Sequence, residues 1–340
     1  MNDLLVSLLR FLLFGGANPL EGQPMPTEAE WQQLFDNAKS EAVTALVCDA
    51  LALLPQAQRP PRRILFHFAT VAQTIETDNR RREAALISFA DRVQAALGLS
   101  TVVVKGSALA SRYPVPLHRE CGDNDLYTGA DTERICTFFE AHGISIDRHN
   151  PRHAVLGYEA TTFELHHHLL YSGSDPQWSP VPFGDSQALM RLPAVQEAFF
   201  LAKQLEYQSV FFHEPVSLRG LLDWTLLVGE PEFDPDAFQA FKQGTDIDRF
   251  ADLLSAYCAQ LFNATLPYDG ERLQALDLKP EHFEALYRAL PPRHPRALVR
   301  VVRRSWHYLR HRRRYRALYG QSMFRRFYWR NLRQALRQRL

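Results

Sequence analysis

The sequence predicts an α+β fold in which a small mixed sheet lies between an N-terminal and a C-terminal helical region. Apolar residues recur at helical spacing through residues 28–54 and 64–97, and again from about residue 186. Between these regions, the β-branched run TVVV at 101–104 and the alternating segment at 162–170 are typical of strands. This mixture of patterns favours a protein with a sheet at its centre.

Pattern and composition divide the chain into four parts. Residues 1–98 are expected to form an N-terminal helical region that ends at Gly98, because glycine often follows the last turn of a helix. Residues 99–185 carry the strand patterns. Residues 186–296 predict a C-terminal helical domain, and residues 297–340 an Arg- and aromatic-rich helical tail.

Within the central part, each element has its own signal. The run at 101–104 stops at Lys105-Gly106-Ser107 and gives way to a short helical turn. Residues 131–142 predict a helix that Gly143 closes. Further strands are expected at about 144–147, 154–158 and 162–170.

The cysteine pattern and the first apolar run narrow the class of protein. The four cysteines have no CxxC spacing, which indicates reduced thiols in a cytosolic protein and neither a disulfide framework nor a cysteine zinc site. The apolar run at residues 4–14 lacks a basic leader and is too short to span a bilayer. We therefore expect no transmembrane segment and a cytoplasmic location. The run predicts a core helix, with a helix on a membrane surface as the alternative.

The net charge of +1 conceals a strong polarity along the chain. Residues 291–340 contain sixteen arginines and no lysine, aspartate or glutamate, which leaves −15 on residues 1–290. Arginines interleaved with aromatic rings suit RNA, whose phosphates and bases they can contact, or an anionic surface such as a membrane. They equally suit a helix whose rings pack on the rest of the protein.

Two aspartates separated by one residue form the first candidate metal site. Asp123 and Asp125 lie where a strand is expected, and side chains two apart on a strand point the same way, with Cα atoms about 6.6 Å apart. Such a pair can bind Mg²⁺, whereas two unneutralised carboxylates would repel one another. The alternative is a turn leading into a solvent-exposed strand edge.

A later segment offers a third carboxylate. In FELHHHL, Glu164, His166 and His168 share one strand face, and Glu164 would join the aspartates if the two strands were neighbours. The three consecutive histidines do not favour zinc, because adjacent strand residues cannot all reach one ion.

These segments together resemble the polymerase-β-like nucleotidyltransferase superfamily, in particular its bacterial branch of nucleotidyltransferase family proteins. The resemblance covers roughly residues 28–230. It rests on the following residues: Lys105-Gly106, Tyr113-Pro114, Arg119, Gly122-Asp123-Asn124-Asp125-Leu126, Glu164 with His166, and Leu218-Arg219-Gly220-Leu221-Leu222-Asp223, with Trp31 and Asn79 upstream. The sequence departs from the pattern at Asn124, where an apolar residue is usual.

The resemblance implies a nucleotidyltransferase core at 99–185 that moves a nucleoside monophosphate from a nucleoside triphosphate, such as ATP, to a hydroxyl acceptor. It implies Mg²⁺ or Mn²⁺ held by the catalytic residues Asp123, Asp125 and Glu164, with Glu164 a candidate for accepting the hydroxyl proton. Gly106 and Ser107 would contact the phosphates. Lys105 and Arg119 would neutralise charge or serve as structural ion-pair partners. The acceptor stays open among RNA, a sugar, a small metabolite and a protein. The alternative is a non-catalytic nucleotide- or RNA-binding protein with a degenerate core.

Overall fold

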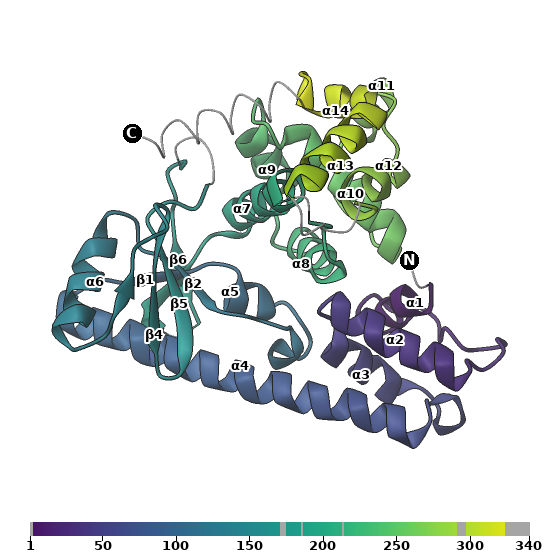
Figure 1. Cartoon of the computed structure of the whole chain (residues 1–340), viewed down its shortest axis with the longest axis horizontal. Coiled ribbons are helices and arrows are strands. Elements are labelled where there is room, and N and C mark those ends of the chain that lie inside the picture. Colours follow the sequence, from purple (N-terminus) through teal and green to yellow (C-terminus); the bar gives the residue numbers. More distant parts are fainter. Residues whose placement is uncertain (1–2, 171–174, 185, 213, 291–296, 324–340) are drawn as a thin grey trace. The chain divides into compact units, whose positions relative to one another are not determined.

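The computed structural model describes residues 3–170, 175–184, 186–212, 214–290 and 297–323, and it is shown in Figure 1. The chain divides into two compact units, Met1–Phe200 and Leu201–Leu340. The first unit contains the N-terminal helices and the sheet. The second contains most of the C-terminal helices.

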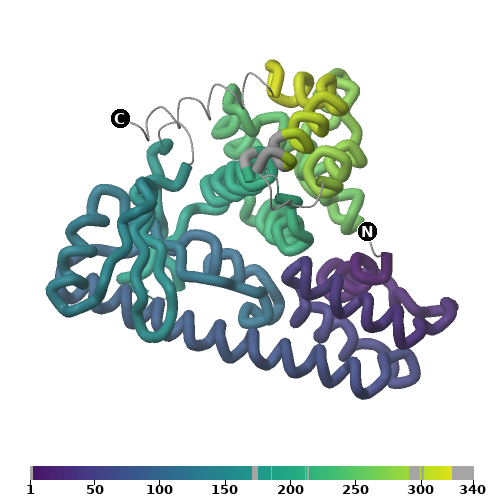
Figure 2. Tube along the Cα trace, in the orientation of Figure 1, coloured from purple at the N-terminus to yellow at the C-terminus, as the bar shows by residue number. Residues whose placement is uncertain are grey.

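Four α-helices and one 3-10 turn precede the sheet. They are α1 (Asp3–Leu13), α2 (Glu28–Ser40), α3 (Thr44–Leu53), η1 (Gln56–Gln58) and α4 (Arg62–Leu97). Helix α1 buries Leu5, Leu8 and Leu9, so the prediction of a core helix is confirmed. Helix α4 ends at Gly98, which adopts the left-handed conformation with φ 67°, as expected from the sequence. Figure 2 shows α2 and α3 against the N-terminal half of α4, with α1 packed on α2 and α3.

The central part forms one mixed sheet with strand order β3-β4-β5-β2-β1-β7-β6. The strands are β1 (Thr101–Val103), β2 (Asn124–Tyr127), β3 (Ile146–Asp147), β4 (His153–Tyr158), β5 (Thr161–His166), β6 (Val181–Phe183) and β7 (Ser186–Arg191). Short helical elements connect them: α5 (Gly106–Ala110), η2 (Pro116–His118), η3 (Gly129–Asp131) and α6 (Thr132–Ala141). Strand β2 runs parallel to β5 and antiparallel to β1. The predicted strands at 144–147, 154–158 and 162–170 correspond to β3, β4 and β5, although β5 ends at His166.

One face of the sheet forms the hydrophobic core with α4 and α6. Phe89 of α4 stacks on Phe139 of α6 at 4.7 Å and on Phe163 of β5 at 4.5 Å between ring centroids. Leu126 and Leu165 belong to the same buried cluster. Because side chains alternate along a strand, burying Phe163 and Leu165 turns Glu164 and His166 to the opposite face.

The helix expected from about residue 186 is wrong for its first six residues, which form strand β7. The segment SQALMR contains good helix formers and no β-branched residue, so its local propensity gives no strand signal. Strand β7 instead pairs in parallel with β1 and in antiparallel with β6. Pairing with both neighbours outweighs the local preference.

Beyond β7, the described chain is helical. The elements are α7 (Ala194–Tyr207), the π-helical turn η4 (Gln208–Phe212), α8 (Leu218–Val228), α9 (Pro235–Lys242), α10 (Asp248–Phe262), α11 (Gly270–Ala275), α12 (Glu281–Phe283), the π-helical turn η5 (Glu284–Arg288), α13 (Ala297–Arg310) and α14 (Arg312–Tyr319). None of the helices in the described ranges is long and apolar enough to cross a membrane.

The described part of the basic tail packs several aromatic rings on the second unit. Tyr308 is buried and donates a hydrogen bond to the Val210 carbonyl at 2.7 Å. Tyr315 is buried and donates to the Leu286 carbonyl at 2.9 Å. Trp306 remains exposed. The packing alternative therefore applies to this part of the tail. Binding of RNA or an anionic surface stays a prediction, and residues 324–340 lie outside the described residues.

Candidate active site

The junction between β1 and α5 is a sharp turn with unusual backbone angles. Lys105 has φ 56° although it carries a side chain, and Gly106 has φ 33°. Such a conformation in a non-glycine residue costs on the order of 1–3 kcal/mol and is concentrated at functional sites. The turn is thus held by its surroundings. It presents Gly106 and Ser107 at the start of a short helix.

The parallel pairing of β2 and β5 places two of the predicted carboxylates, Asp125 and Glu164, side by side. Asp125 pairs directly with Glu164 in the register of the two strands. The two strands are therefore neighbours, which is the arrangement that Glu164 needs in order to join the aspartates. Asp125 is buried, and its Oδ1 accepts hydrogen bonds from Lys105 Nζ and His166 Nε2, each at 2.9 Å. Asp123 lies just before the first residue of β2.

The charges of the three carboxylates act on one another. Burial, followed by the negative charges of Asp125 and Asp123, raises the pKa of the Glu164 carboxyl to about 7. Burial and the charge of Asp125 also raise the pKa of Asp123. Burial would likewise raise the pKa of Asp125, but the Lys105 ammonium and the His166 hydrogen bond hold it well below its usual range. A cation placed among these groups would relieve the repulsion, so the residues present fit a divalent metal ion.

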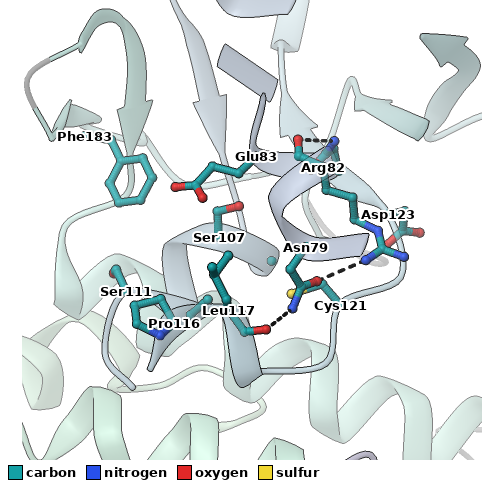
Figure 3. A pocket seen from close by; sticks show the side chains of 13 residues that line it. Asn79, Arg82, Glu83, Ser107, Ser111, Pro116, Leu117, Cys121, Asp123 and Phe183 are labelled. Carbon is teal, nitrogen blue, oxygen red and sulfur yellow. Dashed lines mark hydrogen bonds between the residues drawn. The ribbon is translucent and has the colours of Figure 1, made fainter. Parts of the chain in front are cut away.

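A cavity of about 210 Å³ opens beside this group (Figure 3). Three sets of residues line it: Gly106, Ser107, Ala110 and Ser111 of α5 and the residue after it; Pro116, Leu117, Cys121, Asp123 and Asn124 on the way into β2; and Asn79, Arg82 and Glu83 of α4, with Phe183 of β6. Because Gly106, Ser107 and Asp123 share one cavity, the turn predicted to contact phosphates and a predicted metal ligand face the same space.

Helix α4 is tied to the segment before β2. Asn79 Nδ2 donates to the carbonyls of Leu117 at 2.7 Å and Arg119 at 2.8 Å. Arg82 Nε donates to the Gly122 carbonyl at 3.0 Å, and Asn124 Nδ2 donates to the Arg82 carbonyl at 3.3 Å. Strand alternation turns Asn124 toward α4 while Asp125 faces the site. The departure from the family pattern at Asn124 thus supplies a bond to the wall of the cavity.

Arg119 is buried beneath the turn. Its guanidinium donates to the Gly106 carbonyl at 3.4 Å and to Cys121 Sγ at 3.1 Å. These contacts hold the backbone that carries Gly106 and Ser107. Binding of phosphate by Arg119 or Lys105 stays a prediction.

Two site residues were not identified from the sequence. His153 of β4 pairs in register with His166, and the two rings lie 5.0 Å apart between centroids. Burial, and then the neighbouring His166, lowers the pKa of His153 to about 4. Only the antiparallel pairing of β4 with β5 places His153 beside His166, and the sequence alone does not reveal that pairing. Arg82 could have been found from its helical spacing to Asn79, which puts both on one face of α4.

The model of a family described as uncharacterised nucleotidyltransferases matches residues 27–263. The chain belongs to this family. A search of curated proteins gave no match, and a search of solved structures gave none either. As a member of a nucleotidyltransferase family, the protein is assigned to the transferases. In this nucleotidyltransferase-family protein, the matched segment includes the turn at Lys105, the aspartate pair and Glu164.

Proposed function

We propose that the protein transfers a nucleoside monophosphate from a nucleoside triphosphate to a hydroxyl acceptor in a Mg²⁺- or Mn²⁺-dependent reaction, as in the polymerase-β-like superfamily that it resembles. The observation that carries the proposal is the register of Asp125 against Glu164 on adjacent parallel strands, with Asp123 two residues before Asp125. Three mutually repelling carboxylates, of which Asp123 lines the cavity, suit a divalent ion and its triphosphate.

In this proposal, Asp123, Asp125 and Glu164 hold the metal, which when bound would neutralise the charge of the triphosphate and of the attacking oxygen. Gly106 and Ser107, which line the same cavity as Asp123, cradle the phosphates. Lys105 keeps the buried Asp125 ionised before the metal arrives, through the bond at 2.9 Å. In the metal-free protein, burial first and then the two aspartates raise the pKa of Glu164 to about 7, and a bound cation would lower it again. Glu164 is the candidate for accepting the hydroxyl proton.

The cavity also suggests how the nucleotide is oriented. Asn79, Arg82 and Glu83 bring polar groups from α4 into the same space as Ser107. Arg82 is half-buried, and two of its nitrogens are fixed by the Gly122 carbonyl and the Asn79 side chain. A guanidinium held in one position can bind a phosphate or a base edge with little loss of entropy.

The test is incubation of the full-length protein with each labelled nucleoside triphosphate and Mg²⁺ or Mn²⁺, together with RNA, protein and pooled metabolites. Asp125→Asn and Asp123→Asn should each lower transfer by about 10²–10³-fold, since removing a group that stabilises transition-state charge costs several kcal/mol. Asp147→Asn is the matched control, because that carboxylate is exposed on β3 outside the site. Transfer that is equal in wild type and Asp125→Asn would contradict the proposal. Nucleotide binding without any transfer by the wild type would favour the non-catalytic alternative.

A further inference from the structure

A second group of potential metal ligands lies one strand beyond the aspartates. Strand β5 contributes Glu164 and His166, and β4 contributes His153, which pairs with His166 across the antiparallel ladder. In the part of the chain that the structure describes, these residues are the one group of three whose ligand atoms all lie within 4.8 Å of one another. The imidazole that accompanies His166 is thus that of His153 on the neighbouring strand, and not one from the run of consecutive histidines. His168 points elsewhere, with 68% of its side chain exposed.

The distances within this group are those of ligands around an ion. Glu164 Oε2 lies 3.5 Å from His166 Nε2 and 3.7 Å from His153 Nδ1. Both distances exceed a good N–H···O hydrogen bond, which is about 2.7–3.2 Å. Two ligand atoms bound at about 2.1 Å in a tetrahedral arrangement are about 3.4 Å apart. The oxygen is therefore spaced from each nitrogen as two ligands of one ion are, and all three atoms lie within 4.8 Å of one another.

The imidazoles also have polar atoms that the protein leaves unsatisfied. Nδ1 of His153 and Nδ1 of His166 are buried and have no hydrogen-bond partner among the described residues. The His166 side chain is only 4% exposed and the His153 side chain 13%. A buried polar atom without a partner costs about 1–3 kcal/mol, so its presence calls for an explanation. A metal ion on His153 Nδ1 removes that cost directly.

The donor set selects the class of ion. Mg²⁺ takes oxygen ligands almost exclusively, whereas two imidazoles and one carboxylate suit Zn²⁺ and the neighbouring transition metals. We propose that His153, Glu164 and His166 bind a divalent transition-metal ion, with Zn²⁺ the best match to the observed spacing. Binding through His166 Nε2 places the proton of the neutral ring on Nδ1. Asp125 Oδ1 lies 2.9 Å from the same Nε2, so the metal ion would replace the hydrogen bond that this nitrogen donates to Asp125.

This site shares Glu164 with the proposed catalytic carboxylates, but its existence does not rest on nucleotidyl transfer. Its ligands His153 and His166 belong to no step of that reaction. Binding can therefore be measured on the metal-free protein without nucleotide. Failure of the transfer assay leaves this proposal standing, and failure of metal binding leaves the transfer proposal standing.

The experiment titrates Co²⁺, as a spectroscopic substitute for Zn²⁺, into full-length protein that has been freed of metal by a chelator. The wild type should bind one equivalent with the strong visible absorption of a four- or five-coordinate cobalt site, and Zn²⁺ should displace it. His153→Gln should weaken binding by more than about 10-fold. His168→Gln is the matched control, because it removes an exposed histidine from the same run and should leave binding unchanged. Asp123→Asn should also leave the spectrum in place.

Circular dichroism and thermal unfolding without metal establish that His153→Gln is folded. If that variant does not fold, the wild-type spectrum alone decides, together with its loss on adding Zn²⁺. A weak octahedral cobalt spectrum in the wild type would overturn the proposal. Equal affinity in wild type and His153→Gln would overturn it as well.

Discussion

Replacing Glu164 by glutamine should stabilise the metal-free protein at neutral pH. Burial, followed by repulsion from Asp125 and Asp123, raises the pKa of this carboxyl from 4.5 to about 7. At about 1.4 kcal/mol per tenfold change in proton affinity, that rise corresponds to about 3–4 kcal/mol. Because the side chain is 25% exposed, solvent screening lowers the expected gain to about 1–2 kcal/mol.

The pH dependence of this gain has a definite sign. Between pH 4.5 and about 7, the folded state holds a proton on Glu164 that the unfolded chain has already released. The contribution of Glu164 to the free energy of unfolding of the wild type therefore falls as the pH rises through this window, and it levels off above about pH 7. Glutamine does not titrate, so the advantage of Glu164→Gln should be small near pH 4.5 and largest above about pH 7.

The assay is urea unfolding of wild type and Glu164→Gln in the presence of a chelator, at steps of one unit from about pH 5 to about pH 8. Glu83→Gln serves as the control, because its carboxylate is exposed and its removal should change stability little at any pH. Adding Mn²⁺ should stabilise the wild type and not Glu164→Gln, which reverses the order of the two proteins. A destabilised Glu164→Gln protein, or a difference that does not vary with pH, would refute the reasoning.

Three further substitutions test the surroundings of the site. Lys105→Met removes the ion-pair partner of the buried Asp125 and should destabilise the protein by about 2–4 kcal/mol in chemical unfolding at pH 7. The loss of stability should be smaller in acid, where the carboxylate is protonated, and an equal loss at every pH would contradict this. Arg112→Met breaks a buried ion pair with Glu197 at 2.8 Å and should lower the free energy of unfolding by about 3–5 kcal/mol in the same assay. Adding Glu197→Leu should restore part of this loss, and additive losses would contradict an interaction between the two residues. Asn79→Ala removes two side-chain bonds to backbone carbonyls and should cost about 2 kcal/mol, with weaker nucleotide binding; unchanged melting temperature and binding would count against its role as a cavity wall.

The sequence was sufficient to predict features that depend on local chemistry. Helix α4 ends at the expected Gly98, and Asp123 and Asp125 lie at the edge of a strand as their spacing suggested. The alternation FELH correctly put Phe163 in the core and Glu164 on the other face, because the period of two is a property of any strand.

Features that depend on pairing between distant segments were not predictable. His153 lies beside His166 only because β4 and β5 pair in one register, which no single segment encodes. Strand β7 is a strand because β1 and β6 flank it, although its residues favour a helix. The ion pair of Arg112 with Glu197 joins the turn after α5 to α7, and each residue alone resembles an ordinary surface charge.

Helix α4 has a consequence for how this protein could be cut or recombined. Its 36 residues extend over about 54 Å. Along this length the same helix packs on the N-terminal helices, lines the cavity and contributes to the hydrophobic core of the sheet. A fragment that starts at residue 99 would leave Phe163 without its stacking partner Phe89, and the cavity without Asn79. The sheet is therefore not a module that folds without α4. In a chimera between two relatives, the relative that supplies α4 should therefore determine part of the substrate preference.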